Sequence, residues 1–219
     1  MKNSFIFDFD GTIAETIPVT LKAIEAAYAD NGLPVPSDAE IVAHFGANEY
    51  GMFLKMTPDH ADELFEAYIR EFVAVHQKFP QKPFDGIVAA IRKIKDAGWK
   101  IGLVTGKHIR AAEKAIEIYG LSGLFDDIRC GGINGSVKTQ NISELLDIWA
   151  ISPQNAWYIG DVVSDVIDSR AAGVHPLSAA WTHANITAIA SLEAAEPEEI
   201  FTSVESFNKW LDGLLVDKK

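Results

Sequence analysis

Short apolar runs alternate with longer segments of helical periodicity along most of the chain. The strand-like runs lie at residues 4–7, 100–105, 127–130, 156–159 and 177–181. Between them, apolar residues recur three or four positions apart, which is the spacing of one buried face of a helix. Strands that alternate with helices of this length form βαβ units. The pattern therefore predicts an α/β fold, in which a Rossmann-like parallel sheet carries helices on both faces.

One stretch interrupts this alternation. From residue 15 to about residue 78 no strand is evident, and the pattern is helical throughout. Within it, Ser37-Asp38-Ala39-Glu40 has the form of a capping box that opens a helix. The proline-rich segment 79–84 then leads back to the alternating pattern. We therefore expect a helical cap domain, residues 15–81, inserted into a core domain made of residues 1–14 and 82–219.

The first strand ends in two carboxylates and a glycine, Asp8, Asp10 and Gly11. Side chains two apart in a strand point the same way, so both aspartates can face the carboxyl edge, where open α/β sheets bind ligands. Two carboxylates held this close repel each other unless a cation lies between them or one is protonated. Mg²⁺ is the cation we expect, because it prefers oxygen ligands. Taken without the rest of the chain, this segment could equally be a simple turn after a buried strand, with no cation site.

A second acidic turn follows the strand at residues 156–159. Asp161 and Asp165 lie four positions apart at the start of a helix, where acidic residues also serve as simple helix caps. Together with Asp8 and Asp10, however, they would gather four carboxylates at the ends of two parallel strands. Such a concentration of negative charge is costly unless it binds a cation.

Two further segments suit phosphate. Thr105-Gly106 follows a strand, and its hydroxyl and free N–H fit phosphate oxygens, although Thr-Gly is also an ordinary turn at this place. Lys138 follows a glycine-rich loop and precedes a helix. It would neutralise a bound phosphoryl group as a point charge, whereas most lysines are simply solvated.

Composition narrows the class of protein. The 219 residues are 48% hydrophobic and 23% charged, as in an ordinary soluble protein. A net charge of −12 argues against nucleic-acid and anionic-membrane partners, and requires any phosphate site to be locally positive. Cys130 is the single cysteine, which excludes an intramolecular disulfide and a cysteine-rich zinc site. No apolar run reaches the length of a membrane span, and no signal peptide is evident, so we expect a cytoplasmic monomer or homodimer.

The motifs resemble those of a known family. Asp8-Phe9-Asp10-Gly11-Thr12, Thr105, Lys138 and Gly160-Asp161 with Asp165 resemble, in order and spacing, the four motifs of the haloacid dehalogenase-like superfamily. The helical block resembles the small cap of its phosphoglycolate phosphatase and β-phosphoglucomutase branch. Two positions depart from the usual pattern: Thr139 stands where many relatives have proline, and Glu15-Thr16 where many have Asp-Ser.

The resemblance implies a role for each motif residue. Asp8 would attack phosphorus and become an aspartyl phosphate, and Asp10 would serve as general acid and then as general base. Thr105 and Lys138 would hold the phosphoryl oxygens. Mg²⁺ would bind Asp8, the backbone carbonyl of Asp10 and Asp161, with Asp165 acting through water or as support.

Substrate choice would lie with the cap, because the core recognises only the phosphoryl group. Around the helix break at Gly46, the candidate substrate-binding residues are His44 and Glu49, together with Gly106 in the core; Asn48 and Lys55 are further cap residues of interest. A polar helix end is the alternative explanation for each cap residue.

The expected function is a Mg²⁺-dependent phosphatase acting on a small phosphorylated metabolite, such as phosphoglycolate or a sugar phosphate. A phosphomutase of the β-phosphoglucomutase type and a non-catalytic phosphate-binding module stay open as alternatives. Dehalogenase and phosphonatase chemistry is disfavoured by the presence of Asp10.

Overall fold

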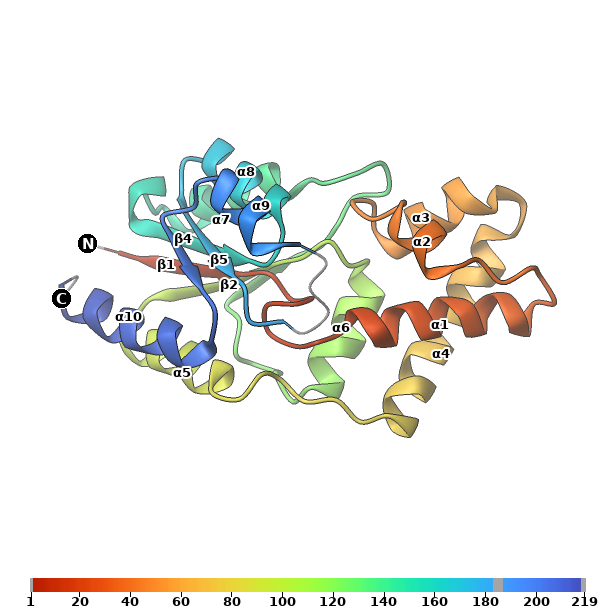
Figure 1. The fold of residues 1–219 in the computed structure, drawn as a ribbon. Coiled ribbons are helices and arrows are strands. Elements are labelled where there is room, and N and C mark those ends of the chain that lie inside the picture. The colour runs from red at the N-terminus through yellow and green to blue at the C-terminus, as the bar shows by residue number, and fades with distance from the viewer. Residues whose placement is uncertain (1, 183–186, 218–219) are drawn as a thin grey trace.

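The computed structural model of the protein describes residues 2–182 and 187–217. Within them, one parallel sheet has the strand order β3-β2-β1-β4-β5-β6 (Figure 1). Its strands are β1 (Ser4–Phe7), β2 (Lys100–Val104), β3 (Asp127–Arg129), β4 (Ala156–Gly160), β5 (His175–Ala179) and β6 (Glu199–Phe201). The predicted α/β class with a parallel sheet is confirmed.

Strand β1 lies in the interior of the sheet, between β2 and β4. Its residues are all apolar or small, so the strand can be covered on both of its faces. Phe5 and Phe7 pack against Phe207 on one side of the sheet. Ile6 faces the other side, in a cluster that includes Leu145 and Trp149. Successive side chains of β1 thus point to opposite faces of the sheet, and the strand contributes to the hydrophobic cluster on each face.

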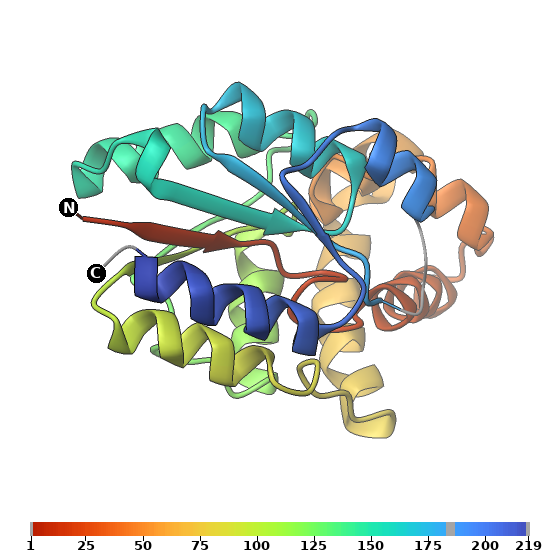
Figure 2. The ribbon, with the colours of Figure 1, turned by 60° about the vertical axis from the view of Figure 1, so that its left-hand side comes forward.

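Helices cover both faces of the sheet, as predicted (Figure 2). The helices α5 (Ile87–Asp96) and α10 (Val204–Asp217) lie on the face of Phe5 and Phe7. The helices α7 (Lys138–Trp149) and α8 (Val163–Ala171) lie on the opposite face. None of the described helices is long and apolar enough to cross a membrane.

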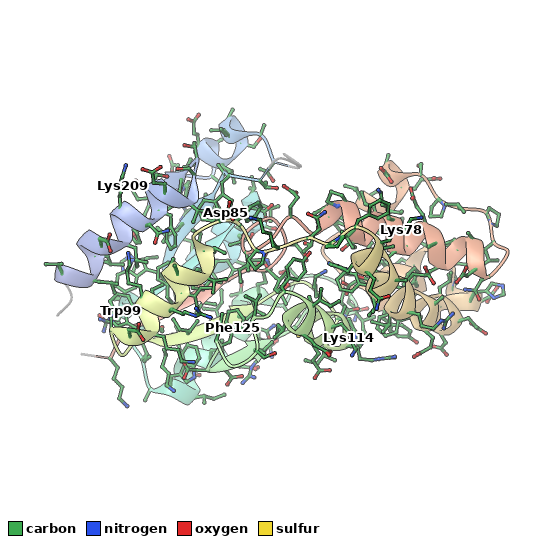
Figure 3. All side chains as sticks on the ribbon, turned by 90° about the horizontal axis from the view of Figure 1, so that it is seen from below. Lys78, Asp85, Trp99, Lys114, Phe125 and Lys209 are labelled. Atoms are coloured by element: carbon green, nitrogen blue, oxygen red, sulfur yellow. The ribbon has the colours of Figure 1, made fainter. Side chains whose placement is uncertain are left out.

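The stretch between β1 and α5 is largely helical and lies to one side of the sheet (Figure 1). It contains α1 (Ile17–Asp30), α2 (Asp38–Val42), α3 (Glu49–Met56), the 3₁₀ helix η1 (Pro58–His60) and α4 (Ala61–Lys78). Aromatic side chains join these helices, with Tyr68 packed between Phe65 and Phe72 and against Phe53. The capping box at Ser37 is present as predicted. The connection from Lys78 back to Asp85 runs from these helices to the sheet (Figure 3). The division into two domains at residues 14/15 and 81/82 stays a prediction.

Several elements differ from the expectation. The fifth strand begins two residues earlier than predicted, at His175. The helix α9 (Ile189–Ala194) and strand β6 (Glu199–Phe201) were not predicted, because six and three residues are too few to display a period. Ile109, the first residue of α6 (Ile109–Ile118), is 44% exposed although it is apolar.

The packing of α7 on β2 makes a first testable prediction. A Cβ at Gly102 would lie 3.0 Å from Trp149 and 3.2 Å from Leu145. Gly102→Ala should therefore lower the free energy of unfolding by roughly 1 to 3 kcal/mol through overpacking. Gly213→Ala is the matched control, since nothing lies within 4 Å of its Cβ position in α10. That control should stabilise the helix by about 0.5 to 1 kcal/mol. Urea unfolding of both variants checks the pair, and equal midpoints would contradict this packing.

Candidate active site

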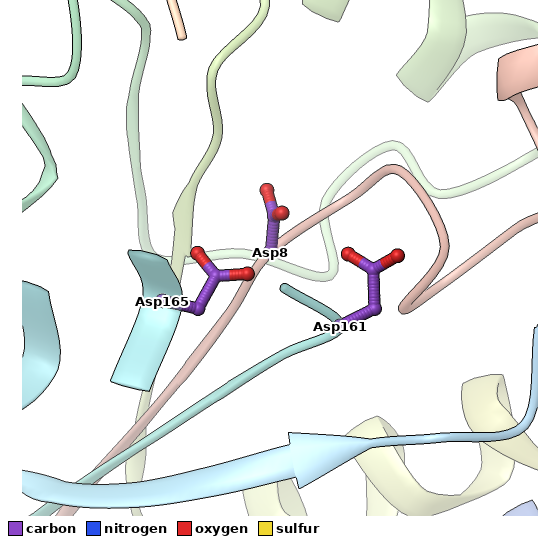
Figure 4. Close-up of side chains that lie close together, drawn as sticks. All are labelled: Asp8, Asp161 and Asp165. Carbon is purple, nitrogen blue, oxygen red and sulfur yellow. The ribbon is translucent and has the colours of Figure 1, made fainter. Parts of the chain in front are cut away.

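The carboxyl ends of β1 and β4 place three aspartates together. The strands pair in parallel with Phe7 opposite Ile159, and the Asp8 N–H donates to the Ile159 carbonyl at 2.9 Å. Asp161 follows β4 directly, and Asp165 lies in the first turn of α8. One carboxylate oxygen from each aspartate lies within 4.8 Å of the others. Figure 4 shows the three side chains around one common space.

Two glycines make this approach possible. A Cβ at Gly11 would lie 2.1 Å from Asp161 Oδ2, and one at Gly160 would lie 2.2 Å from Asp165 Oδ2. Gly11 also has a φ of +69°, which side chains other than glycine rarely adopt. The glycine beside each acidic motif is therefore a steric requirement of the carboxylate cluster.

Lys138 supplies a positive charge to the cluster. It is buried at the start of α7, with its Nζ 2.9 Å from Asp8 Oδ2 and 2.5 Å from Asp165 Oδ1. The Tyr158 hydroxyl also donates to Asp165 Oδ1, at 3.1 Å. Although burial opposes the charged form, Asp165 and Asp8 raise the pKa of Lys138 well above its usual value. The lysine is thus held as a cation beside Asp8.

One lysine does not neutralise three carboxylates. Burial raises the pKa of Asp8 to about 7; Lys138 acts against this rise, and Asp165 and Asp10 add to it. Burial, followed by the charges of Asp165 and Asp8, raises the pKa of Asp161 well above its usual value. The cluster is therefore short of positive charge.

The donor set fits a hard divalent cation. Asp8 Oδ1 is buried and has no hydrogen-bond partner among the described residues. A buried carboxylate oxygen without a partner is costly, and it lies within a cluster whose ligand atoms are all oxygens. Oxygen-only sites that include few carboxylates are typical of Mg²⁺.

Asp10 lies apart from the cluster and has its own partners. The Thr16 hydroxyl donates to Asp10 Oδ1, and Lys107 Nζ lies 3.1 Å from the same oxygen. Lys107 is 2% exposed and also contacts Glu49 Oε1 at 3.4 Å. Burial opposes the charge of Lys107, but Asp10, Tyr68 and Glu49 raise its pKa well above the usual value. A buried cation thus joins the Asp10 loop to the helical segment.

Glu49 connects that segment to the sheet at a second point. Its carboxylate accepts the His108 N–H at 2.6 Å and the Tyr68 hydroxyl at 3.1 Å. The neighbouring Asn48 donates its N–H to Gly132 and its side-chain amide to Gly131, both at 2.8 Å. The start of α3 is therefore docked on the loops that follow β2 and β3.

A cavity of about 460 Å³ lies between this docked segment and the sheet edge. The predicted site residues that line it are Asp8, Asp10, Glu49, Gly106, Lys138 and Asp161. Lys107 lines it as well. The sequence interpretation missed the apolar part of the wall, although the helix break at Gly46 had indicated its position.

Three predicted residues do not line the cavity. Thr105 is fully buried, and its hydroxyl accepts the Lys107 N–H at 3.3 Å. Asp165 is a member of the carboxylate cluster but is fully buried. The structure does not bring His44 to the cavity: its Nδ1 bonds the Glu40 carbonyl at 2.8 Å, and the residue lines a separate depression together with Lys55.

The family model described as haloacid dehalogenase-like hydrolase matches residues 5–179 of the chain. The chain belongs to this family. A phosphoglycolate phosphatase from Psychrobacter arcticus is 26% identical, over 94% of this chain and 95% of the relative. Pyrophosphatase PpaX from Bacillus cereus is 24% identical, over 90% of each chain. The structure of CbbY from Rhodobacter sphaeroides in complex with phosphate superposes with a TM-score of 0.75 at 19% identity, covering 93% of this chain and 95% of that one. The predicted family and enzyme class, a phosphatase, are confirmed.

Glu49 provides a test of the docking contacts. Glu49→Ala leaves the His108 N–H and Tyr68 hydroxyl without an acceptor and removes one of the two carboxylates at Lys107. We expect the free energy of unfolding to fall by about 3 to 5 kcal/mol, as when one partner of a buried ion pair is removed. Urea unfolding measures this loss.

Glu66→Ala is the control, because it removes an ion pair with Arg110 between α4 and α6 in which both side chains are exposed. Exposed pairs contribute little, so its loss should be much smaller. Equal losses in the two variants would show that the buried contacts of Glu49 do not hold α3 on the sheet.

Proposed function

We propose that this protein is a Mg²⁺-dependent phosphatase that hydrolyses a small phosphomonoester through an aspartyl phosphate on Asp8. The observation that carries the proposal is the environment of Asp8. Its Oδ2 contacts Lys138, while its buried Oδ1 has no partner in the described chain and belongs to a three-carboxylate cluster. A carboxylate is ionised and nucleophilic without a base, provided that nearby cations keep its pKa low.

In the proposed first step, an Asp8 carboxylate oxygen forms a bond to phosphorus, and the bond from phosphorus to the leaving oxygen breaks. Asp10 gives a proton to that oxygen, and the alcohol departs. In the second step, water attacks the aspartyl phosphate while Asp10 takes its proton. Inorganic phosphate leaves, and Asp8 is restored. Both aspartates line the same cavity, as these roles require.

Mg²⁺ would be held by Asp8, Asp161 and the backbone carbonyl of Asp10, with Asp165 in support. When bound, it offsets the negative charge of nucleophile and phosphate and stabilises charge on the transferring group. Lys138, whose Nζ contacts Asp8 Oδ2, has a comparable electrostatic role. The Gly106 backbone, which lines the cavity, would orient the phosphoryl oxygens, and the buried Thr105 hydroxyl would hold this turn through the Lys107 N–H.

We also propose that residues 15–81 act as a cap that opens to admit substrate, with hinges near Glu15-Thr16 and Gln81-Lys82. Glu49 and Asn48 hold the docked position by contacts that can be exchanged for water. Closing over the cavity would exclude water while the first step proceeds.

Asp8→Asn tests the nucleophile. With Mg²⁺ present, we expect phosphate release from phenyl phosphate to fall at least about 10³-fold, because an amide cannot form the intermediate. Asp59→Asn, at an exposed aspartate of the cap, is the matched control and should retain activity. Turnover of Asp8→Asn close to that of the native protein would exclude Asp8 as the nucleophile.

Asp161→Asn tests the metal site, because its effect on thermal stability should differ with and without Mg²⁺. Without divalent cation the variant should unfold at the same temperature as the native protein or higher, since a carboxylate repelled by Asp8 and Asp165 has been removed. With Mg²⁺ at 100 times its dissociation constant, the native protein should gain about 2.7 kcal/mol. The variant should gain much less. Thermal unfolding with and without Mg²⁺ measures both, and equal gains would remove Asp161 from the metal site.

A further inference from the structure

The two walls of the cavity differ in chemistry. The sheet side carries the carboxylates and lysines described above. The helical side is formed mainly by apolar residues of α1, α2, α3 and the α2–α3 connection. These are Ile17, Val42, Phe45, Ala47 and Met52. Thr20 adds one hydroxyl, and Glu49 is the charged residue on this side.

The cations that line the cavity already have partners. Lys107 contacts Asp10 and Glu49, and Lys138 contacts Asp8 and Asp165. Within residues 2–182 and 187–216, the cavity lining contains no further lysine, arginine or histidine. Glu49 would repel an anionic group of the substrate, because its own charge is negative.

A substrate with a second anionic group would therefore leave that group unpaired against the apolar wall. An unpaired buried charge is strongly unfavourable. Phosphoglycolate carries such a group in its carboxylate, and pyrophosphate in its second phosphate. A sugar phosphate meets a related difficulty, because its hydroxyls would find only Thr20 and Glu49 as polar side chains on this side.

We infer that the alcohol released by this protein is uncharged and mainly apolar, and that Val42, Phe45 and Met52 select it by contact. This inference rests on the proposed function and specifies its substrate class. The phosphoryl group lies against the charged sheet edge, and the organic group lies against the helical wall. Burial of apolar surface then supplies the binding energy of the leaving group.

The test is a panel of phosphate compounds of small size with Mg²⁺: phenyl phosphate, phosphoglycolate, pyrophosphate and glucose 6-phosphate. Phosphate release gives kcat/KM for each. We expect phenyl phosphate to exceed each of the other three by about 100-fold or more, because a site discriminates strongly when polar groups are left unpaired. A higher kcat/KM for any of the other three would overturn the inference.

Two matched variants test the wall itself. Val42 is partly exposed and lines the cavity at the end of α2, so it tolerates a longer side chain. Val42→Lys should lower the preference for phenyl phosphate over phosphoglycolate at least about tenfold, because it places a cation on the apolar wall. Val42→Met has similar length without charge and should keep the preference. Equal ratios in both variants would show that this wall does not select the leaving group.

Binding separates this inference from the proposed function. Asp8→Asn, which lacks the nucleophile, should be stabilised thermally by phenyl phosphate at lower concentration than by phosphoglycolate. If native protein releases phosphate from none of the four compounds, the proposed function fails, and the inference fails with it. If it hydrolyses phosphoglycolate or pyrophosphate best, the proposed function stands and the inference alone is overturned.

Discussion

The crowding of carboxylates at one edge of the sheet is the constraint on which the rest of this structure depends. Parallel pairing of β1 with β4 ends both strands at the same level, so Asp8 and Asp161 cannot avoid each other. Without positive charge, burial and mutual repulsion favour protonation of both. Lys138 compensates for part of this cost through its ion pairs with Asp8 and Asp165. The cluster still lacks positive charge after this compensation, and a bound cation would supply it.

A second buried cation connects the sheet to the helical segment. Lys107 contacts Asp10 on one side and Glu49 on the other, so a residue proposed for proton transfer shares its counter-ion with a docking residue. Moving α3 away would leave Lys107 with Asp10 alone. The charge beside Asp10 therefore depends on whether the helices are docked. This coupling follows from one lysine having two carboxylate partners, and it needs no further contact between the helices and the reacting atoms.

The sequence predicted the sheet and the acidic cluster for the same reason. A buried parallel strand has a continuous apolar run, and polar residues that end such a run must lie at the carboxyl edge, as Asp161 does. The short elements Ile189–Ala194 and Glu199–Phe201 have too few residues for a period to appear. Residues of the helical wall could not be predicted, because their direction depends on how α1–α4 pack together. His44 and Phe45 are adjacent in sequence, yet only Phe45 lines the cavity.

The two walls of the cavity differ because they are proposed to bind different parts of the substrate. Every phosphomonoester presents the same anionic group, so the edge proposed to bind it can be built from fixed charges at strand ends, where backbone pairing sets their spacing. The organic group has no fixed chemistry. In the proposed arrangement it lies against side chains from α1, α2, α3 and the α2–α3 connection, which can change without disturbing β1 or β4. Because the two lysines of the cavity are already engaged in ion pairs, a new specificity for anions would require a new cation on the helical wall rather than a rearrangement of the sheet edge.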